Sequence, residues 1–217
     1  MPSHKDIADP QVKSKFCELA ARKKYGLDKN ARKYVRYMGH RSGFEYLLCY
    51  CGSTGKELVR HTDYAADHVG LPKKHLVRAE EKNSRLVLHH NHPQNMSLSS
   101  VDIQHLLGRQ GMVEIFAHAH DGSWYWAESL RKRGALGMAK YGDIAIVDAY
   151  CVLAGYGIYL DPRLAAHFLN LALDRVGAVV YKFGLSSSIL ASLGQVSMQR
   201  REWLLNFVTE AIRKERQ

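Results

Sequence analysis

Short apolar runs separated by turn residues predict a β-sheet in the middle of the chain. Runs of about four to eight apolar or β-branched residues between glycine, proline and aspartate are typical of strands. Residues 44–51 lead into a turn at Gly52–Gly55 and a return strand, which indicates a hairpin. Further strands are expected over residues 85–90 and 112–118 and, after the Asp121-Gly122 turn, over residues 124–126.

Apolar residues at helical spacing predict helices on both sides of this sheet region. Residues 9–38 hold two short amphipathic patterns that are separated at Gly26, and another pattern begins near Ile103. We expect residues 62–72 to form a polar loop with a helical turn. From Glu128 onward the pattern is mostly helical: Pro162 opens a helix that Gly177 interrupts or ends, and a last apolar stripe consists of Trp203, Leu204, Phe207, Val208 and Ile212.

Composition and charge bound the class of protein. Of the 217 residues 46% are hydrophobic, so the chain can bury a sizeable core. Its 31 Lys and Arg against 21 Asp and Glu favour an acidic partner, such as nucleic acid or an acidic protein surface. A solvated helix face is the simpler explanation of the basic cluster in the N-terminal helices; docking of such a partner is the alternative. That cluster consists of Lys13, Lys15, Arg22, Lys23, Lys24, Lys29, Arg32, Lys33 and Arg36.

The cysteines and the first residues indicate the compartment. Cys17, Cys49, Cys51 and Cys151 offer no second metal pair, and we expect them to be reduced and buried, which favours a reducing compartment. The opening ten residues lack an apolar signal region, and no apolar run approaches the length of a membrane span. We therefore expect a cytoplasmic protein that does not enter a membrane.

The chemistry of the chain is concentrated where the strand 85–90 ends. His90 and His92 are two apart on an extended backbone, so their imidazoles point to one side and can converge on one ion. Ser99 and Asp102 form a Ser-x-x-Asp pattern that predicts a helix N-cap, and it would turn the aspartate back toward the histidines. Two histidines and a carboxylate leave a tetrahedral zinc ion one position for water. The alternative is that Asp102 only caps the helix and that the histidines are polar residues at a strand end.

The sequence HNHP followed by Ser-x-x-Asp resembles the JAMM (MPN+/JAB) zinc metallopeptidases, most closely the RadC-like branch of bacteria and phages. The resemblance covers roughly residues 43–127. It implies that His90, His92 and Asp102 bind one zinc ion and that Ser99 donates a hydrogen bond to the oxyanion. The loop from Pro93 to Leu98 is one residue shorter than in the deubiquitinase members, which leaves the substrate class open.

The same resemblance implies a glutamate on an upstream strand that acts as general base. Glu45, at the start of the predicted hairpin, is our candidate; Glu57 on the return strand competes with it, and the Glu80, Glu81 pair fits a solvated loop better. His118 and His120 repeat the His-x-His spacing without a following Ser-x-x-Asp, so we expect them to be structural or to line the substrate site.

These observations predict an α/β (α+β) fold, a JAMM-like mixed sheet flanked by helices. Its regions would be a basic helical segment over residues 1–42, the JAB/MPN-like core over residues 43–128, and a mostly helical region over residues 129–217 that covers the sheet or forms a dimer interface. The expected function is zinc-dependent hydrolysis of a peptide or isopeptide bond in a protein or peptide, such as a ubiquitin-like substrate. The alternative is a RadC-like nucleic-acid-associated protein without peptidase activity.

Overall fold

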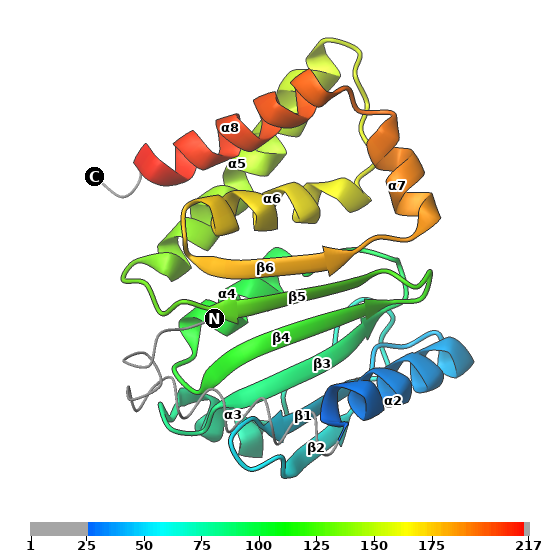
Figure 1. Cartoon of the computed structure of the whole chain (residues 1–217), viewed down its shortest axis with the longest axis vertical. Helices are drawn as coiled ribbons and strands as arrows, with labels where there is room; N and C mark the ends of the chain where they lie inside the picture. The colour runs from blue at the N-terminus through cyan, green and yellow to red at the C-terminus, as the bar shows by residue number, and fades with distance from the viewer. Residues whose placement is uncertain (1–25, 215–217) are drawn as a thin grey trace, which may run out of the picture.

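A six-stranded mixed sheet forms the centre of the molecule, with the strands in the order β2-β1-β3-β4-β5-β6 (Figure 1). The computed structural model describes residues 26–214. Only β3 and β4 are parallel neighbours; every other adjacent pair is antiparallel. The strands are β1 (Leu47–Cys51), β2 (Glu57–His61), β3 (Leu86–His92), β4 (Met112–Ala119), β5 (Trp124–Ser129) and β6 (Val179–Gly184). The predicted mixed α/β fold is confirmed.

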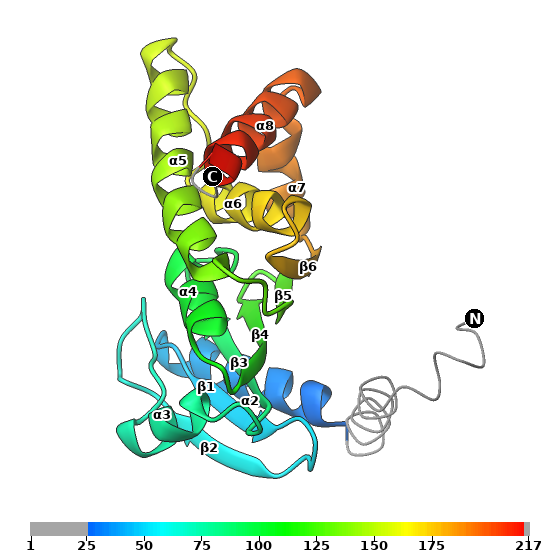
Figure 2. The ribbon, with the colours of Figure 1, turned by 90° about the vertical axis from the view of Figure 1, so that its left-hand side faces the viewer.

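Helices lie on both faces of this sheet, as Figure 2 shows for α2 and α4 beside β3. Parallel strands need a long crossover, and here α4 makes the connection between β3 and β4. The helices are α2 (Leu27–Ser42), α3 (Lys73–Glu80), α4 (Ser100–Gly108), α5 (Ala135–Gly155), α6 (Arg163–Arg175), α7 (Ser187–Gly194) and α8 (Met198–Lys214). The crossover helix therefore begins beside the end of β3, where the histidines lie.

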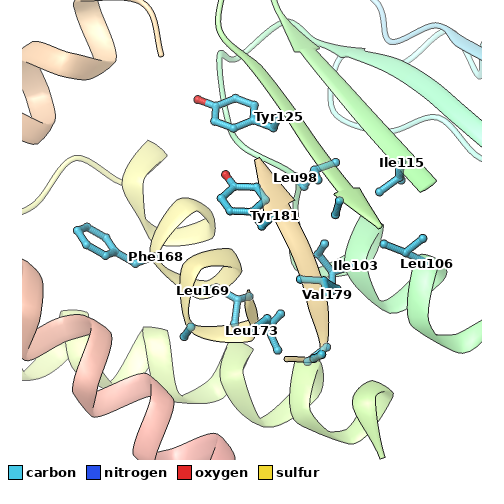
Figure 3. Packing of buried hydrophobic residues seen from close by; sticks show 14 of the residues in the cluster. Leu98, Ile103, Leu106, Ile115, Tyr125, Phe168, Leu169, Leu173, Val179 and Tyr181 are labelled. Atoms are coloured by element: carbon cyan, nitrogen blue, oxygen red, sulfur yellow. The ribbon is translucent and has the colours of Figure 1, made fainter. Parts of the chain in front are cut away.

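The larger hydrophobic core joins the sheet to the C-terminal helices. Ile115 of β4 and Val179 of β6 share this core with Leu106 of α4 and Leu169 of α6 (Figure 3). Burying a Leu or Ile side chain contributes about 1.5–3 kcal/mol. Because the core extends from β1 to α8, the C-terminal helices help to fix the strands that carry the histidines.

The opposite face of the sheet packs on α2. Ala31 and Val35 of this helix are fully buried against residues of β1, β3 and β4. A Cβ atom at Gly39 would lie 2.2 Å from the Asn91 amide nitrogen, so only glycine allows the helix to approach β3 this closely. The expected helix after Gly26 is thus confirmed. The other expected helix, and most of the basic cluster, lie outside the described residues.

Three details differ from the sequence expectation. The C-terminal region contributes β6, which the periodicity did not predict, and the boundary expected after residue 128 falls inside β5. No helical turn forms between Thr62 and Pro72; α3 begins directly after Pro72 instead. Proline fits there because its fixed φ suits the start of a helix and its missing N–H leaves no donor unsatisfied.

The cysteines are less uniformly buried than expected. Cys49 is buried in β1, but Cys51 is half-buried and Cys151 is exposed on α5, while Cys17 lies outside the described residues. The expectation of four buried thiols is therefore wrong for Cys51 and Cys151. Between residues 26 and 214, none of the helices combines the length and the apolar character that crossing a bilayer requires.

Candidate metal centre

The two histidines of the candidate site lie on the face of β3 that looks toward α4. Every residue of β3 is buried. His90 pairs with Leu47 of β1 and Ala117 of β4, so strands on both sides hold its backbone in place. Because side chains alternate along a strand, His92 follows His90 on the same face and His89 and Asn91 point toward α2.

The third group comes from the first turn of α4. The Ser99 side chain accepts from the Asp102 N–H at 3.1 Å, and the Asp102 Oδ2 atom accepts from the Ser99 N–H and Oγ–H, both at 2.7 Å. This is the capping box that the Ser-x-x-Asp pattern predicts. Two hydrogen bonds thus hold the carboxylate and the third closes the turn, with Oδ1 nearest the His90 Nε2 atom and Oδ2 nearest that of His92.

The ligand atoms of these three residues converge. The Nε2 atoms of His90 and His92 lie 2.8 Å apart, and they lie 3.3 Å and 3.5 Å from the nearest oxygens of Asp102. Donor atoms around a tetrahedral zinc ion with bonds of 2.0–2.1 Å stand about 3.3 Å apart. Among the described residues, this is the one group of three or more His, Cys, Asp or Glu whose donor atoms could share a metal ion.

The hydrogen bond of His92 is that of a metal ligand, whereas His90 lacks the corresponding contact. The His92 Nδ1–H donates to the Met96 carbonyl at 3.0 Å, which leaves the Nε2 lone pair directed at the centre. The His90 Nδ1 atom is buried without a hydrogen-bond partner. Two buried imidazoles whose Nε2 atoms face each other need a shared partner, and a divalent ion would provide it.

The charges in the site are strongly coupled. Burial would lower the pKa of His92, but the hydrogen bond and the charge of Asp102 raise it to about 9. Burial would raise the pKa of Asp102, but His90 and His92 hold it well below its usual range. The carboxylate is therefore ionised at neutral pH, as a metal ligand must be, whereas the His92 imidazole has to release a proton when a metal binds.

A cavity of about 270 Å³ opens beside the three ligands. Glu45 lines it, together with His68, Ser99 and apolar residues such as Leu71 and Met96. His68 belongs to the expected polar loop over residues 62–72, and its spacing to the other histidines gives no indication that it lies at the cavity.

Glu45 lies two residues before β1, at the strand end expected of the general base. Its backbone N–H donates to the Ala65 carbonyl at 2.7 Å, and only 6% of the residue is exposed. Burial raises the pKa of its carboxyl, partly offset by the nearby His92 and His90. A carboxylate whose pKa lies above its usual value is a stronger base than an exposed glutamate.

The competing glutamates lie elsewhere. Glu57 is exposed on β2 and accepts two hydrogen bonds from Arg60, both at 2.8 Å. Glu80 pairs with Arg109, and Glu81 accepts a hydrogen bond from Ser84. None of these glutamates lines the cavity.

The remaining histidines of this region lie on the face toward α2. His118 bonds to His89, which in turn bonds to Asp28 of α2 at 3.1 Å. His120 lies 3.1 Å from the Asn91 amide nitrogen and stacks on His40. These contacts join α2 to the sheet on the side opposite the candidate metal centre.

Two residues of the C-terminal region hold the loop between the ligands, and no sequence pattern pointed to them. The Asn170 amide of α6 donates to the Ser97 hydroxyl at 3.1 Å and to the Leu98 carbonyl at 2.8 Å. The Tyr181 hydroxyl of β6 lies 2.7 Å from the Ser97 hydroxyl. The loop that spaces His92 from Asp102 is therefore anchored by side chains far along the chain.

Comparison of the chain with protein-family models, curated proteins and solved structures finds no match. The site must therefore be interpreted from its own geometry.

Proposed function

We propose that this chain is a zinc-dependent hydrolase that cleaves a peptide or isopeptide bond, as the resemblance to the JAMM metallopeptidases suggests. The observation that carries the proposal is the convergence of His90, His92 and Asp102 on one point, beside the buried carboxyl of Glu45. A closed structural site would use four protein ligands, whereas three leave a position for chemistry.

His90 and His92 would hold the ion through their Nε2 atoms and Asp102 through its Oδ1 atom. When bound, zinc lowers the pKa of a coordinated water to about 7 and polarises a carbonyl group. Ser99 keeps Asp102 in position through the hydrogen bonds of the capping box. Its hydroxyl proton is directed at Asp102, so we assign Ser99 first to positioning the ligand. The oxyanion contact that the resemblance implies stays a prediction.

Glu45 is the residue of this pocket that can move the proton. In hydrolysis, water oxygen bonds to the carbonyl carbon, the carbon–nitrogen bond breaks, and a proton passes from the water to the leaving nitrogen. The Glu45 carboxylate would accept that proton and then donate it, so it returns to its starting state. The ligand residues would be committed to the metal or to hydrogen bonds. His68 and Asp67 also line the cavity, but they bond to each other on an exposed loop, and His105 bonds to Arg109. The buried Glu45 is therefore our candidate for this task.

The cavity supports a substrate with an apolar group next to the scissile bond. Leu47, Leu88 and Ile115 line its walls, together with Leu71 and Met96. Such a lining favours an apolar side chain because burying it removes apolar surface from water. A protein or peptide substrate is consistent with this lining.

The test is a proteomic search for cleaved products with the wild-type chain and Glu45→Gln, both loaded with zinc. We expect the variant to retain zinc and to form none of the products. The substitution replaces the carboxylate that acts as the base with an amide, and it removes no metal ligand. Glu57→Gln is the matched control, because this glutamate is exposed and paired with Arg60. Products that persist undiminished with Glu45→Gln, or that vanish equally with Glu57→Gln, would contradict the proposed role.

A nucleic-acid-associated function is the second candidate, favoured by the formal charge of +10 and by the exposed Lys29, Lys33 and Arg41 of α2. Binding driven by phosphate contacts must weaken steeply as salt rises. Tight, salt-sensitive binding together with a zinc-free chain would favour this candidate over the hydrolase.

A further inference from the structure

Helix α5 exposes an apolar stripe that a globular protein does not normally leave in water. Ile144 and Val147 are each 59% exposed and Val152 is 41% exposed. The opposite face of α5 is buried and packs against α4, α6 and α8. Figure 2 shows α5 along one edge of the molecule, with α6 and α8 on its other side.

Most of the exposed residues form one seam along the helix, and Val152, about 80° from Ile144, lies at its edge. At 100° per residue, Lys140, Val147, Asp148 and Cys151 all fall within about 60° of Ile144. The sequence of α5 is apolar almost all round, a pattern typical of a helix that is covered on every side. Within residues 26–214, no helix or strand covers this seam.

The charges of the seam indicate which partner covers it. Lys140 and Asp148 lie four residues before and four residues after Ile144, both are exposed, and neither has an ion-pair partner within the described part of the chain. When two copies of one helix pair antiparallel about a twofold axis, positions at equal distances on either side of the axis face each other. With the axis at Ile144, each Lys140 meets Asp148 of the second copy.

We propose that the chain forms a homodimer in which α5 packs antiparallel on α5 of a second copy, with the twofold axis at Ile144. The two Ile144 side chains meet at the centre, flanked by two Lys140–Asp148 pairs. Gly137, whose added Cβ would meet no atom within 4 Å, lies opposite Cys151 of the second copy and leaves room for it.

This arrangement places the candidate metal centres at opposite ends of the dimer. α5 begins near α4, which carries Asp102, and runs away from the sheet (Figure 2). Antiparallel pairing therefore leaves each cavity open to its own substrate. The proposal does not depend on the proposed function.

Sedimentation velocity over a range of concentrations tests the dimer. We expect a dimer for the wild type and at least a roughly hundredfold weaker association for Ile144→Asp, because two charges would be buried at the centre. Lys140→Asp and Asp148→Lys should each weaken association roughly tenfold, and the double variant Lys140→Asp/Asp148→Lys should restore it. Thermal unfolding checks that each variant folds.

A disulfide tests the position of the axis. In a Cys151→Ser background, Ile144→Cys should form a covalent dimer under mild oxidation, because the two introduced thiols would meet on the axis. The wild-type Cys151 residues would lie about 21 Å apart along the helices and should not cross-link. Three results would each overturn the proposal. The first is a monomer at every concentration, and the second is a double charge variant that fails to restore association. The third is a wild-type chain that cross-links through Cys151 while the Ile144→Cys variant does not cross-link.

Discussion

Replacing Ser99 by alanine isolates the part of the metal centre that is built into α4. The change removes the hydroxyl that donates to Asp102 Oδ2 at 2.7 Å and that accepts from the Asp102 N–H at 3.1 Å. The hydrogen bond from the Ser99 N–H to the same carboxylate oxygen can remain. The Asp102 carboxylate thus keeps one of its two hydrogen bonds from Ser99 and is held less firmly in its orientation.

Two magnitudes follow from these contacts. Loss of an N-cap side chain typically lowers the free energy of unfolding by about 1 kcal/mol. Loss of a hydrogen bond that orients a metal ligand typically weakens metal binding by about 10-fold to 100-fold. We therefore expect Ser99→Ala to bind zinc about 10-fold to 100-fold more weakly and to be modestly less stable without zinc.

The assay is a competition titration against a zinc chelator, combined with urea unfolding of the zinc-free protein. Ser186→Ala is the matched control, because Ser186 caps α7 and also donates to a carboxylate, Asp121 Oδ2, at 2.6 Å. It should lose similar stability and keep wild-type zinc affinity. If Ser99→Ala binds zinc as tightly as the wild type, the capping box does not orient a ligand and the reasoning fails.

Burial lowers the pKa of His167 to about 4, below its value of about 6.5 in an unfolded chain, so unfolding takes up a proton between these pH values. The free energy of unfolding should therefore fall by up to about 3 kcal/mol as the pH drops from about 6.5 to 4. Urea titrations at several pH values should show that His167→Gln lacks this part of the pH dependence. A Cβ atom at Gly142 of α5 would lie 2.6 Å from Leu169 Cδ1 and 3.0 Å from Ile212 Cδ1, so Gly142→Ala should destabilise the chain by about 1 kcal/mol or more despite its better helix propensity. Gly155→Ala, which meets no atom within 4 Å, should not lower the denaturant midpoint.

The local parts of the site could be predicted from sequence because short-range rules determine them. Alternation along a strand puts His90 and His92 on one face, and the Ser-x-x-Asp pattern predicts the cap at Ser99. The turn at Asp121-Gly122 likewise predicts that β4 and β5 form a hairpin, which the pairing of these strands confirms. Each of these inferences needs only residues that are close in the chain.

The remaining features depend on contacts between distant residues. The run that forms β6 is short and apolar, and such a run fits a buried helix as well as a strand until its neighbour is known. Asn170 and Tyr181 hold Ser97 across separations of 73 and 84 residues, which no local pattern reports. Glu45 could be named as a candidate only through the resemblance, because its place in the cavity depends on how β1 sits beside β3.

The zinc content of the purified chain and of His92→Ala, measured by elemental analysis, tests the central claim most directly. The ligand geometry predicts one zinc ion per chain in the wild type and loss of most of it in the variant, since two remaining ligands hold zinc poorly. A wild-type chain that takes up no zinc when it is supplied, or a His92→Ala variant with undiminished stoichiometric zinc, would contradict the account.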